Sequence, residues 1–202
     1  MKRNNHKILL FIFTAGLFLS SACRSSSNSG GFEILGPADE TAEAAKLVQA
    51  ANADLKKIKV LYEANENKRQ ELKNALGSDN KDEVKKISDG VVQLINEGFD
   101  SGKAAVEKIQ QAGDMDTNDD YKEYLRLKES ALLRQMEAFE QYRQAARTLR
   151  DNYDPKNTQQ REKVKKDFEQ RSENYREIME KARSYSEQAN ELYKETRQQQ
   201  QQ

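Results

Sequence analysis

The feature that most constrains this chain is the spacing of its apolar residues, which alternates between steps of three and four over long stretches. Such spacing places the apolar side chains on one narrow stripe of an α-helix, as at the seam of a coiled coil. In the first stretch only Asn65 and Arg69 interrupt the register. A helix of this kind must pair its stripe with others in order to bury it. The apolar positions of the first stripe are Ala44, Val48, Ala51, Leu55, Ile58, Tyr62, Leu72 and Leu76.

The composition is compatible with a folded chain only because the apolar residues are concentrated in this way. Charged residues make up 34% of the 202 residues and hydrophobic residues 36%, and the mean hydropathy is -1.03. Without periodic spacing, such a composition is typical of disorder. The chain has only nine Gly and two Pro, which argues against a loop-rich or β-sandwich protein. Its many Ala, Glu, Lys, Gln, Arg and Leu residues favour long helices, so the sequence predicts an all-α fold.

Local signals divide the chain from residue 37 onward into four helices. We expect Gly77 at the C′ position that stops the first helix, and Asn80-x-x-Glu83 has the spacing of a capping box for the second. The acids after Asn118 suit the start of the third helix. In Asp154-Pro155, Asp is expected to cap the fourth helix with Pro in its first turn. The expected helices cover residues 38–76, 80–112, 119–152 and 155–197.

Short connections make successive helices antiparallel neighbours. The sequence therefore predicts an antiparallel four-helix bundle with coiled-coil-like seams over residues 37–197, followed by a polar Gln tail at 198–202. The seams are thin and contain many Ala and Tyr residues. Two alternatives therefore stay open, namely a looser pair of helical hairpins and an oligomeric coiled coil completed by a second chain.

The first 22 residues have the pattern of an export signal. Three basic residues lie in 1–7, a mostly apolar run covers 8–19, and Ser20, Ser21 and Ala22 are small. The apolar run is too short for a membrane-spanning helix, which needs about 20 apolar residues. The sole cysteine, Cys23, follows directly.

Leu19-Ser20-Ser21-Ala22-Cys23 resembles the lipobox of bacterial lipoproteins, with Ser20 at the position where that family prefers Leu. The resemblance implies cleavage between Ala22 and Cys23 and diacylation of Cys23, and two acyl chains give stable membrane anchoring. Residues 23–36 would then be the acylated cysteine and a flexible Ser/Gly tether. By the same resemblance, a Gram-negative host would place the protein in the outer membrane, facing the periplasm.

No catalytic or metal-binding constellation is recognisable in the mature chain. The only histidine, His6, lies within the signal, which excludes His-dependent nucleophilic catalysis and His metal ligands after cleavage. The acidic segment 114–120 lacks the Gly and the Glu of a calcium loop. The segment Gly98–Lys103 lacks the spacing and the hydroxyl residue of a phosphate loop. We therefore expect no enzyme activity and no cofactor.

The expected function is that of a lipid-anchored helical envelope protein, acting by protein–protein contact or as an extracytoplasmic scaffold. Its partners would be the membrane, through the lipid, and another envelope protein or a second copy of itself. From Cys23 onward the chain carries 31 basic and 34 acidic residues, which gives no support for nucleic-acid binding. The alternative is a small-ligand binding or sensory four-helix module. A peptidoglycan or polysaccharide binder is a third possibility.

Overall fold

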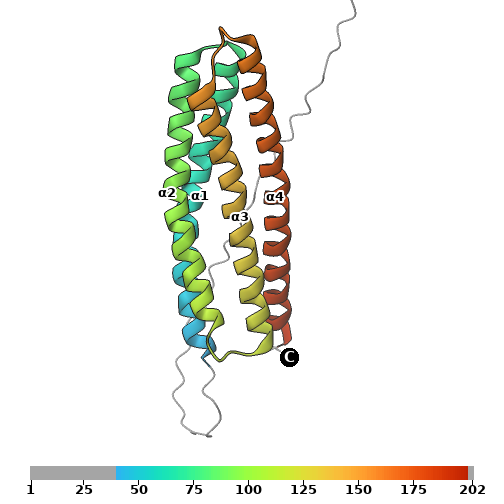
Figure 1. Ribbon diagram of the computed structural model, residues 1–202. Helices are drawn as coiled ribbons and strands as arrows, with labels where there is room; N and C mark the ends of the chain where they lie inside the picture. Colours follow the sequence, from blue (N-terminus) through green and yellow to red (C-terminus); the bar gives the residue numbers. More distant parts are fainter. Residues whose placement is uncertain (1–39, 200–202) are drawn as a thin grey trace, which may run out of the picture. The chain divides into compact units, whose positions relative to one another are not determined.

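The computed structural model describes residues 40–199, with side chains up to residue 195, and these residues form four long helices. Successive helices run in opposite directions (Figure 1). The predicted all-α, antiparallel four-helix bundle is therefore confirmed. The predicted signal, Cys23 and the tether lie outside the described residues. The helices are α1 (Thr41–Gly77), α2 (Lys81–Gly113), α3 (Asp119–Asn152) and α4 (Thr158–Gln199).

The bundle has two distinct ends. At the proximal end, where α1 begins and α4 finishes, the loop 114–118 joins α2 to α3 (Figure 1). Glu40 is fixed to this loop, because its backbone N–H donates to Asp116 O at 3.0 Å and its carboxylate accepts from Asp116 N at 2.8 Å. The distal end carries the α1–α2 turn, residues 78–80, and the α3–α4 turn, residues 153–157.

The helices pack in chain order, α1 on α2, α2 on α3 and α3 on α4, most extensively within the two hairpins α1–α2 and α3–α4. The backbones of α1 and α4 are not closely packed against each other. Long side chains therefore link α1 to the second hairpin. One such link is the hydrogen bond from Lys128 Nζ of α3 to Asn52 Oδ1 of α1, at 3.2 Å.

The core consists of two apolar clusters that follow one another along the bundle. The distal cluster draws on all four helices and contains large side chains such as Leu72, Tyr142 and Tyr175. The proximal cluster consists of residues of α1, α2 and α3, among them Ala51, Ile109 and Leu132. Ala is the most frequent of the buried hydrophobic residues, as the thin seams of the sequence predict.

The predicted cap of α2 is confirmed, and the predicted stop of α1 is wrong. Asn80 Oδ1 accepts from Glu83 N at 3.2 Å. The third helix begins at Asp119 as expected, and the structure shows Asn118 as its cap, since Asn118 Oδ1 accepts from Tyr121 N at 2.9 Å. Gly77, however, is the last residue of α1, and the left-handed residue is Asp79 with φ 51°. The bond from Asn80 N to Ala75 O, at 3.1 Å, makes Asp79 the C′ residue of a Schellman motif.

The start of α4 also differs from the expectation. The helix begins at Thr158 rather than at Pro155, and Asn157 is its cap, since Asn157 Oδ1 accepts from Gln160 N at 3.0 Å. Asp154 and Pro155 instead form a turn closed by the bond from Asn157 N to Asp154 O at 3.2 Å. Pro is favoured both at the second position of a turn and at the start of a helix. The Asp154-Pro155 pair therefore fits either structure.

Asp79 joins the two turns of the distal end. Its Oδ1 accepts from the Tyr153 hydroxyl at 2.5 Å and from Lys165 Nζ at 3.2 Å, and its Oδ2 accepts from Arg161 Nη1 at 3.0 Å. The hydrogen bond from Tyr153, followed by that from Lys165, holds the pKa of Asp79 below its ordinary value of 3.8. One carboxylate on the first hairpin is thus bound by three side chains of the second.

We expect Asp79→Asn and Asp79→Ala to lower the melting temperature, and Ala more than Asn, because Asn tolerates the left-handed conformation while Ala does not. The lowered pKa means that the carboxylate stabilises the fold above pH 3.8 and loses this effect as the pH falls below that value. Thermal unfolding across the pH range should therefore show the difference between wild type and Asp79→Asn shrinking in acid. A difference independent of pH would contradict this role of the carboxylate.

Candidate functional site

The most unusual feature of the core is a buried amide without a protein partner. Asn65 of α1 is only 2% exposed, and neither its Oδ1 nor its Nδ2 forms a hydrogen bond within the described residues. It occupies a seam position of α1, so the helix period itself turns this side chain inward. An unpaired buried polar group costs about 1–3 kcal/mol, so Asn65 weakens the core at this level.

One turn further along α1, Arg69 lies against two neighbouring tyrosine rings of the second hairpin. Its guanidinium carbon is 5.4 Å from the ring centre of Tyr142 in α3 and 5.6 Å from that of Tyr175 in α4. Its Nη1 donates to Glu66 Oε1 at 2.6 Å. Arg69 thus forms a cation–π contact with each of the two rings and links α1 to both helices of the second hairpin.

Further aromatic rings continue the contact between the hairpins. The ring centres of Tyr142 and Tyr175 lie 5.6 Å apart, and that of Phe139 lies 6.2 Å from Tyr175 and 6.4 Å from Tyr62 of α1. Phe168 of α4 completes the group, with its ring centre 6.0 Å from that of Tyr142. We call Asn65, Arg69 and these five aromatic residues the polar–aromatic layer.

The titratable groups of this layer are unsuited to acid–base chemistry near neutral pH. Burial raises the pKa of Tyr175 well above its ordinary value, and burial likewise raises the pKa of Tyr142 and of Tyr62. The tyrosines therefore stay neutral, and Arg69 stays charged. The hydroxyls of Tyr142 and Tyr175 have no hydrogen-bond partner within the described chain. The layer positions helices and supplies no nucleophile or general base.

A second buried polar group lies in the proximal half. Asp54 of α1 is 8% exposed, and its carboxylate accepts from Lys108 Nζ of α2 at 2.7 Å and from Lys57 Nζ at 3.0 Å. The hydrogen bond from Lys108 is the main cause that lowers the pKa of Asp54. This ion pair joins the helices of the first hairpin.

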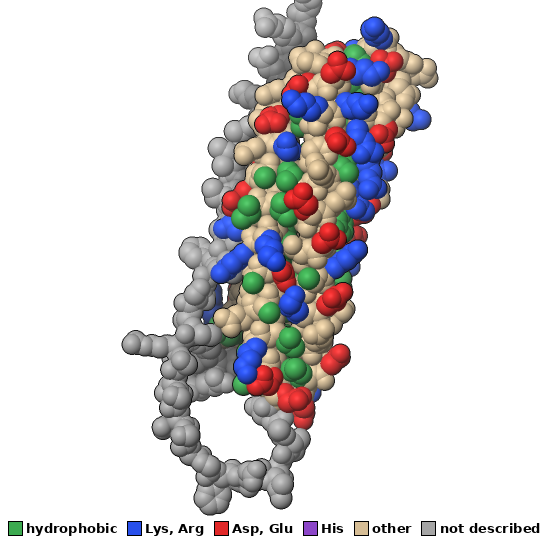
Figure 2. Space-filling view, turned by 90° about the vertical axis from the view of Figure 1, so that its left-hand side faces the viewer, with side chains coloured by type: hydrophobic (Ala, Val, Ile, Leu, Met, Phe, Trp, Pro, Cys, Tyr) green, Lys and Arg blue, Asp and Glu red, His purple; other side chains and the backbone are tan. Residues whose placement is uncertain are grey.

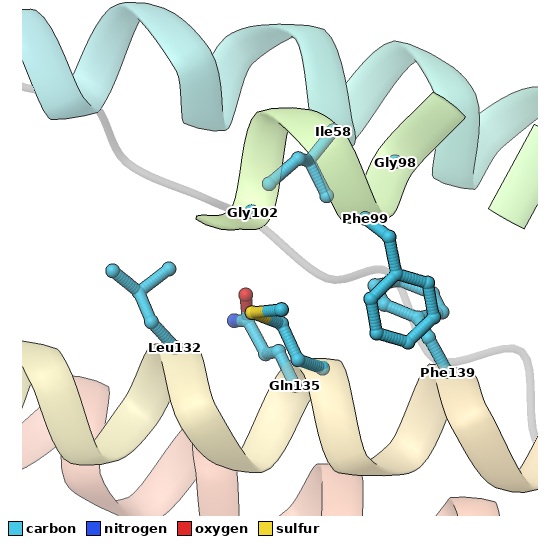
Figure 3. A pocket seen from close by; sticks show the side chains of 8 residues that line it. Ile58, Gly98, Phe99, Gly102, Leu132, Gln135 and Phe139 are labelled. Carbon is cyan, nitrogen blue, oxygen red and sulfur yellow. The ribbon is translucent and has the colours of Figure 1, made fainter. Parts of the chain in front are cut away.

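Two small hollows lie between α1, α2 and α3, beside the polar–aromatic layer. They share Ile58, Gly98 and Phe139, and Asn65 lines one of them. In the other, Phe99, Gln135 and Phe139 surround the space next to the glycines of α2 (Figure 3). Each has a volume of about 10 Å³, roughly one water molecule. Neither accommodates an organic cofactor in this conformation.

The other residues considered in the sequence fall at the surface or outside the described range. Cys23, the predicted lipidation site, lies outside it. Asp114 and Asp116 are exposed in the proximal loop. Within residues 40–195, no group of three or more Asp, Glu, His or Cys side chains is arranged to hold a metal ion. No helix among the described residues is long and apolar enough to cross a membrane.

In the sequence, Asn65 and Arg69 stand out only as interruptions of a stripe. Their register is the available signal, because a polar residue at a seam position faces the partners of that seam. Tyr142 and Tyr175 lie in the regular apolar spacing of α3 and α4, and both are buried. Their contact with Arg69 depends on how the hairpins pack and has no local signature.

Comparison with known proteins adds no functional information. No protein-family model matches the chain, and neither a curated protein nor a solved structure is significantly similar to it.

We expect Asn65→Leu to raise the free energy of unfolding by about 1–3 kcal/mol, because Leu has nearly the shape of Asn and removes two unpaired polar groups. Asn65→Asp is the matched control and should be strongly destabilising, since it buries a charge at the same place. Chemical denaturation of the three proteins measures both effects. A destabilised Asn65→Leu would show that the amide is satisfied in solution.

Gly98→Ala should stabilise the protein by about 1 kcal/mol, because it removes a helix-interior glycine and its Cβ enters the hollow. That Cβ would meet only Leu61 Cδ1, at 3.8 Å, an ordinary contact. Gly102→Ala is the control, since its Cβ would lie 3.2 Å from Met136 Cγ and Sδ and force that side chain to shift. Thermal unfolding should therefore favour Gly98→Ala over Gly102→Ala, and the reverse order would contradict the geometry.

Proposed function

We propose that this protein is a lipid-anchored scaffold of the bacterial envelope, with diacylated Cys23 in the membrane and the helical bundle presenting a binding surface outside it. The observation that carries the proposal is the position of Cys23. It is the only cysteine of the chain, and it follows an apolar run and three small residues. Two acyl chains on this residue would give stable anchoring.

The form of the bundle supports a spacer role. The segment that precedes Glu40 joins α1 at the proximal end, so an anchor on Cys23 would act through that end. With 33 residues in α2 and a rise of 1.5 Å per residue, the bundle is about 50 Å long. The distal end is therefore about 50 Å from the end at which the chain enters the bundle.

The interior of the bundle favours function at the surface rather than inside. The hollows hold about one water molecule each, and the buried tyrosines are neutral at physiological pH. A sensory module of the four-helix type would need a ligand cavity. The two hollows between α1, α2 and α3 are too small for such a ligand in this conformation, and surface contact is therefore the better-supported mode.

The lipid anchor predicts that wild-type protein, isolated from its native envelope, begins at Cys23 and carries acyl chains detectable by mass spectrometry. Cys23→Ser should release the protein from the membrane fraction or leave its signal uncleaved. Ser25→Ala, a neighbouring change in the tether, is the control and should leave both processing and anchoring unchanged. A mature amino terminus at another residue, without acyl chains, would overturn the proposal.

A further inference from the structure

The charged residues of the bundle are distributed unequally between its ends. The proximal end, residues 40–54, 107–132 and 183–195, holds thirteen acids and seven bases. The distal end, residues 68–92 and 147–168, holds nine acids and thirteen bases. Figure 2 shows this on one face, with acidic side chains gathered toward the proximal end at the bottom and basic ones toward the distal end. The bundle therefore has an electrostatic direction along its length.

Ion pairing sharpens the difference. At the proximal end Lys46, Lys108 and Arg126 are paired with acids, whereas Asp114 of the loop and Asp119 and Asp120 of α3 have no ion-pair partner among the described residues.

At the distal end the situation is reversed, because the acids are largely paired. Asp79 alone binds two bases. Lys85 and Arg147 lie close enough to Asp151 to help lower its pKa. Four further exposed distal bases have no ion-pair partner within the described part of the chain, namely Lys86, Lys156, Lys163 and Lys166.

Helix dipoles account for only part of this polarity. Asp119 and Asp120 suit the N-terminus of α3 at the proximal end, and Arg150 suits its C-terminus at the distal end. Glu187 and Glu191, however, lie toward the C-terminus of α4, where acids are unfavourable. Each end of an antiparallel bundle has two helix N-termini and two C-termini, so the dipoles do not by themselves predict an excess of one sign at either end.

The distal end offers charge without an apolar anchor. The large apolar side chains exposed among the described residues are Val60, Leu133 and Tyr193, and none of them belongs to this end. Stable contacts with folded proteins centre on buried aromatic or aliphatic residues, and insertion into a lipid surface also requires them. A partner held by charge alone is instead a flexible polymer with many anionic groups.

We propose that the distal end is a binding surface for an anionic polysaccharide of the cell envelope, with carboxylate or phosphate groups along its chain. Lys85 and Lys86 of α2, Arg147 of α3, and Lys163 and Lys166 of α4 bind these groups. The choice of polymer over membrane lipid rests on the missing apolar anchor, and the choice of the cell envelope rests on the proposed function. Membrane lipid and a second copy are the alternatives that the experiment separates.

Each contact with such a polymer is weak, and the surface acts through their number. Exposed charge pairs contribute little individually and are screened beyond about 10 Å at 0.1 M salt. Neutralising several polymer charges releases counterions, so the affinity should fall steeply as the salt concentration rises. Bases on three helices of one rigid end allow a single chain to contact several of them together.

The test measures binding of the full chain, in detergent solution, to polygalacturonate and to poly(glycerol phosphate), with dextran as the neutral polymer. We expect salt-dependent binding to the two anionic polymers and none to dextran. Lys85→Glu/Lys86→Glu should weaken binding by roughly tenfold or more. The matched control is Lys103→Glu/Lys181→Glu, the same charge change on exposed residues near the middle of the bundle, and it should have a much smaller effect.

The outcomes separate this inference from the proposed anchor. Equal losses in the two double variants, or no binding to either polymer, would overturn the distal surface while leaving anchoring through Cys23 intact. Tighter binding to vesicles of phosphatidylglycerol and phosphatidylcholine than to the polymers would assign the surface to lipid instead. Salt-sensitive self-association lost in Lys85→Glu/Lys86→Glu would assign it to a second copy. Polymer binding with an unacylated native amino terminus would support the surface and reject the anchor.

Discussion

The contact of Arg69 with the rings of Tyr142 and Tyr175 links α1 to the second hairpin. Because the backbones of α1 and α4 are not closely packed, the first hairpin meets α4 through side chains, namely through this contact, the ion pairs of Asp79 and the distal apolar cluster. A cation over aromatic rings contributes more when it is shielded from water. The Arg69 side chain is 36% exposed, and its partner Glu66 compensates the charge at this partly buried place.

The two ends of the bundle are closed by polar contacts of different kinds. At the distal end one carboxylate, Asp79, binds three side chains of the second hairpin. At the proximal end Glu40 and Asp116 exchange backbone and side-chain hydrogen bonds. Between them, a core rich in Ala and Tyr and interrupted by Asn65 gives limited apolar burial. The bundle therefore relies on specific polar contacts to fix the relative position of its hairpins.

The interior and the surface of the bundle differ in character. The interior has neutral tyrosines, paired charges and hollows the size of a water molecule, whereas the exterior carries a graded charge from one end to the other. The chain enters the bundle at the acidic end, so the basic end is the one away from that point of entry.

The sequence by itself determined the helices, since the 3.6-residue period and the caps at Asn80 and Asn118 are local properties of the chain. It failed at Gly77 and at Asp154-Pro155, where two local structures of similar energy compete and contacts between the turns decide. The tertiary structure alone decided that Arg69 contacts two tyrosine rings and that Asp79 joins the turns. It also brought three distant acidic segments to one end. These outcomes depend on antiparallel packing, which places residues far apart in the chain side by side and leaves no mark in the spacing of either partner.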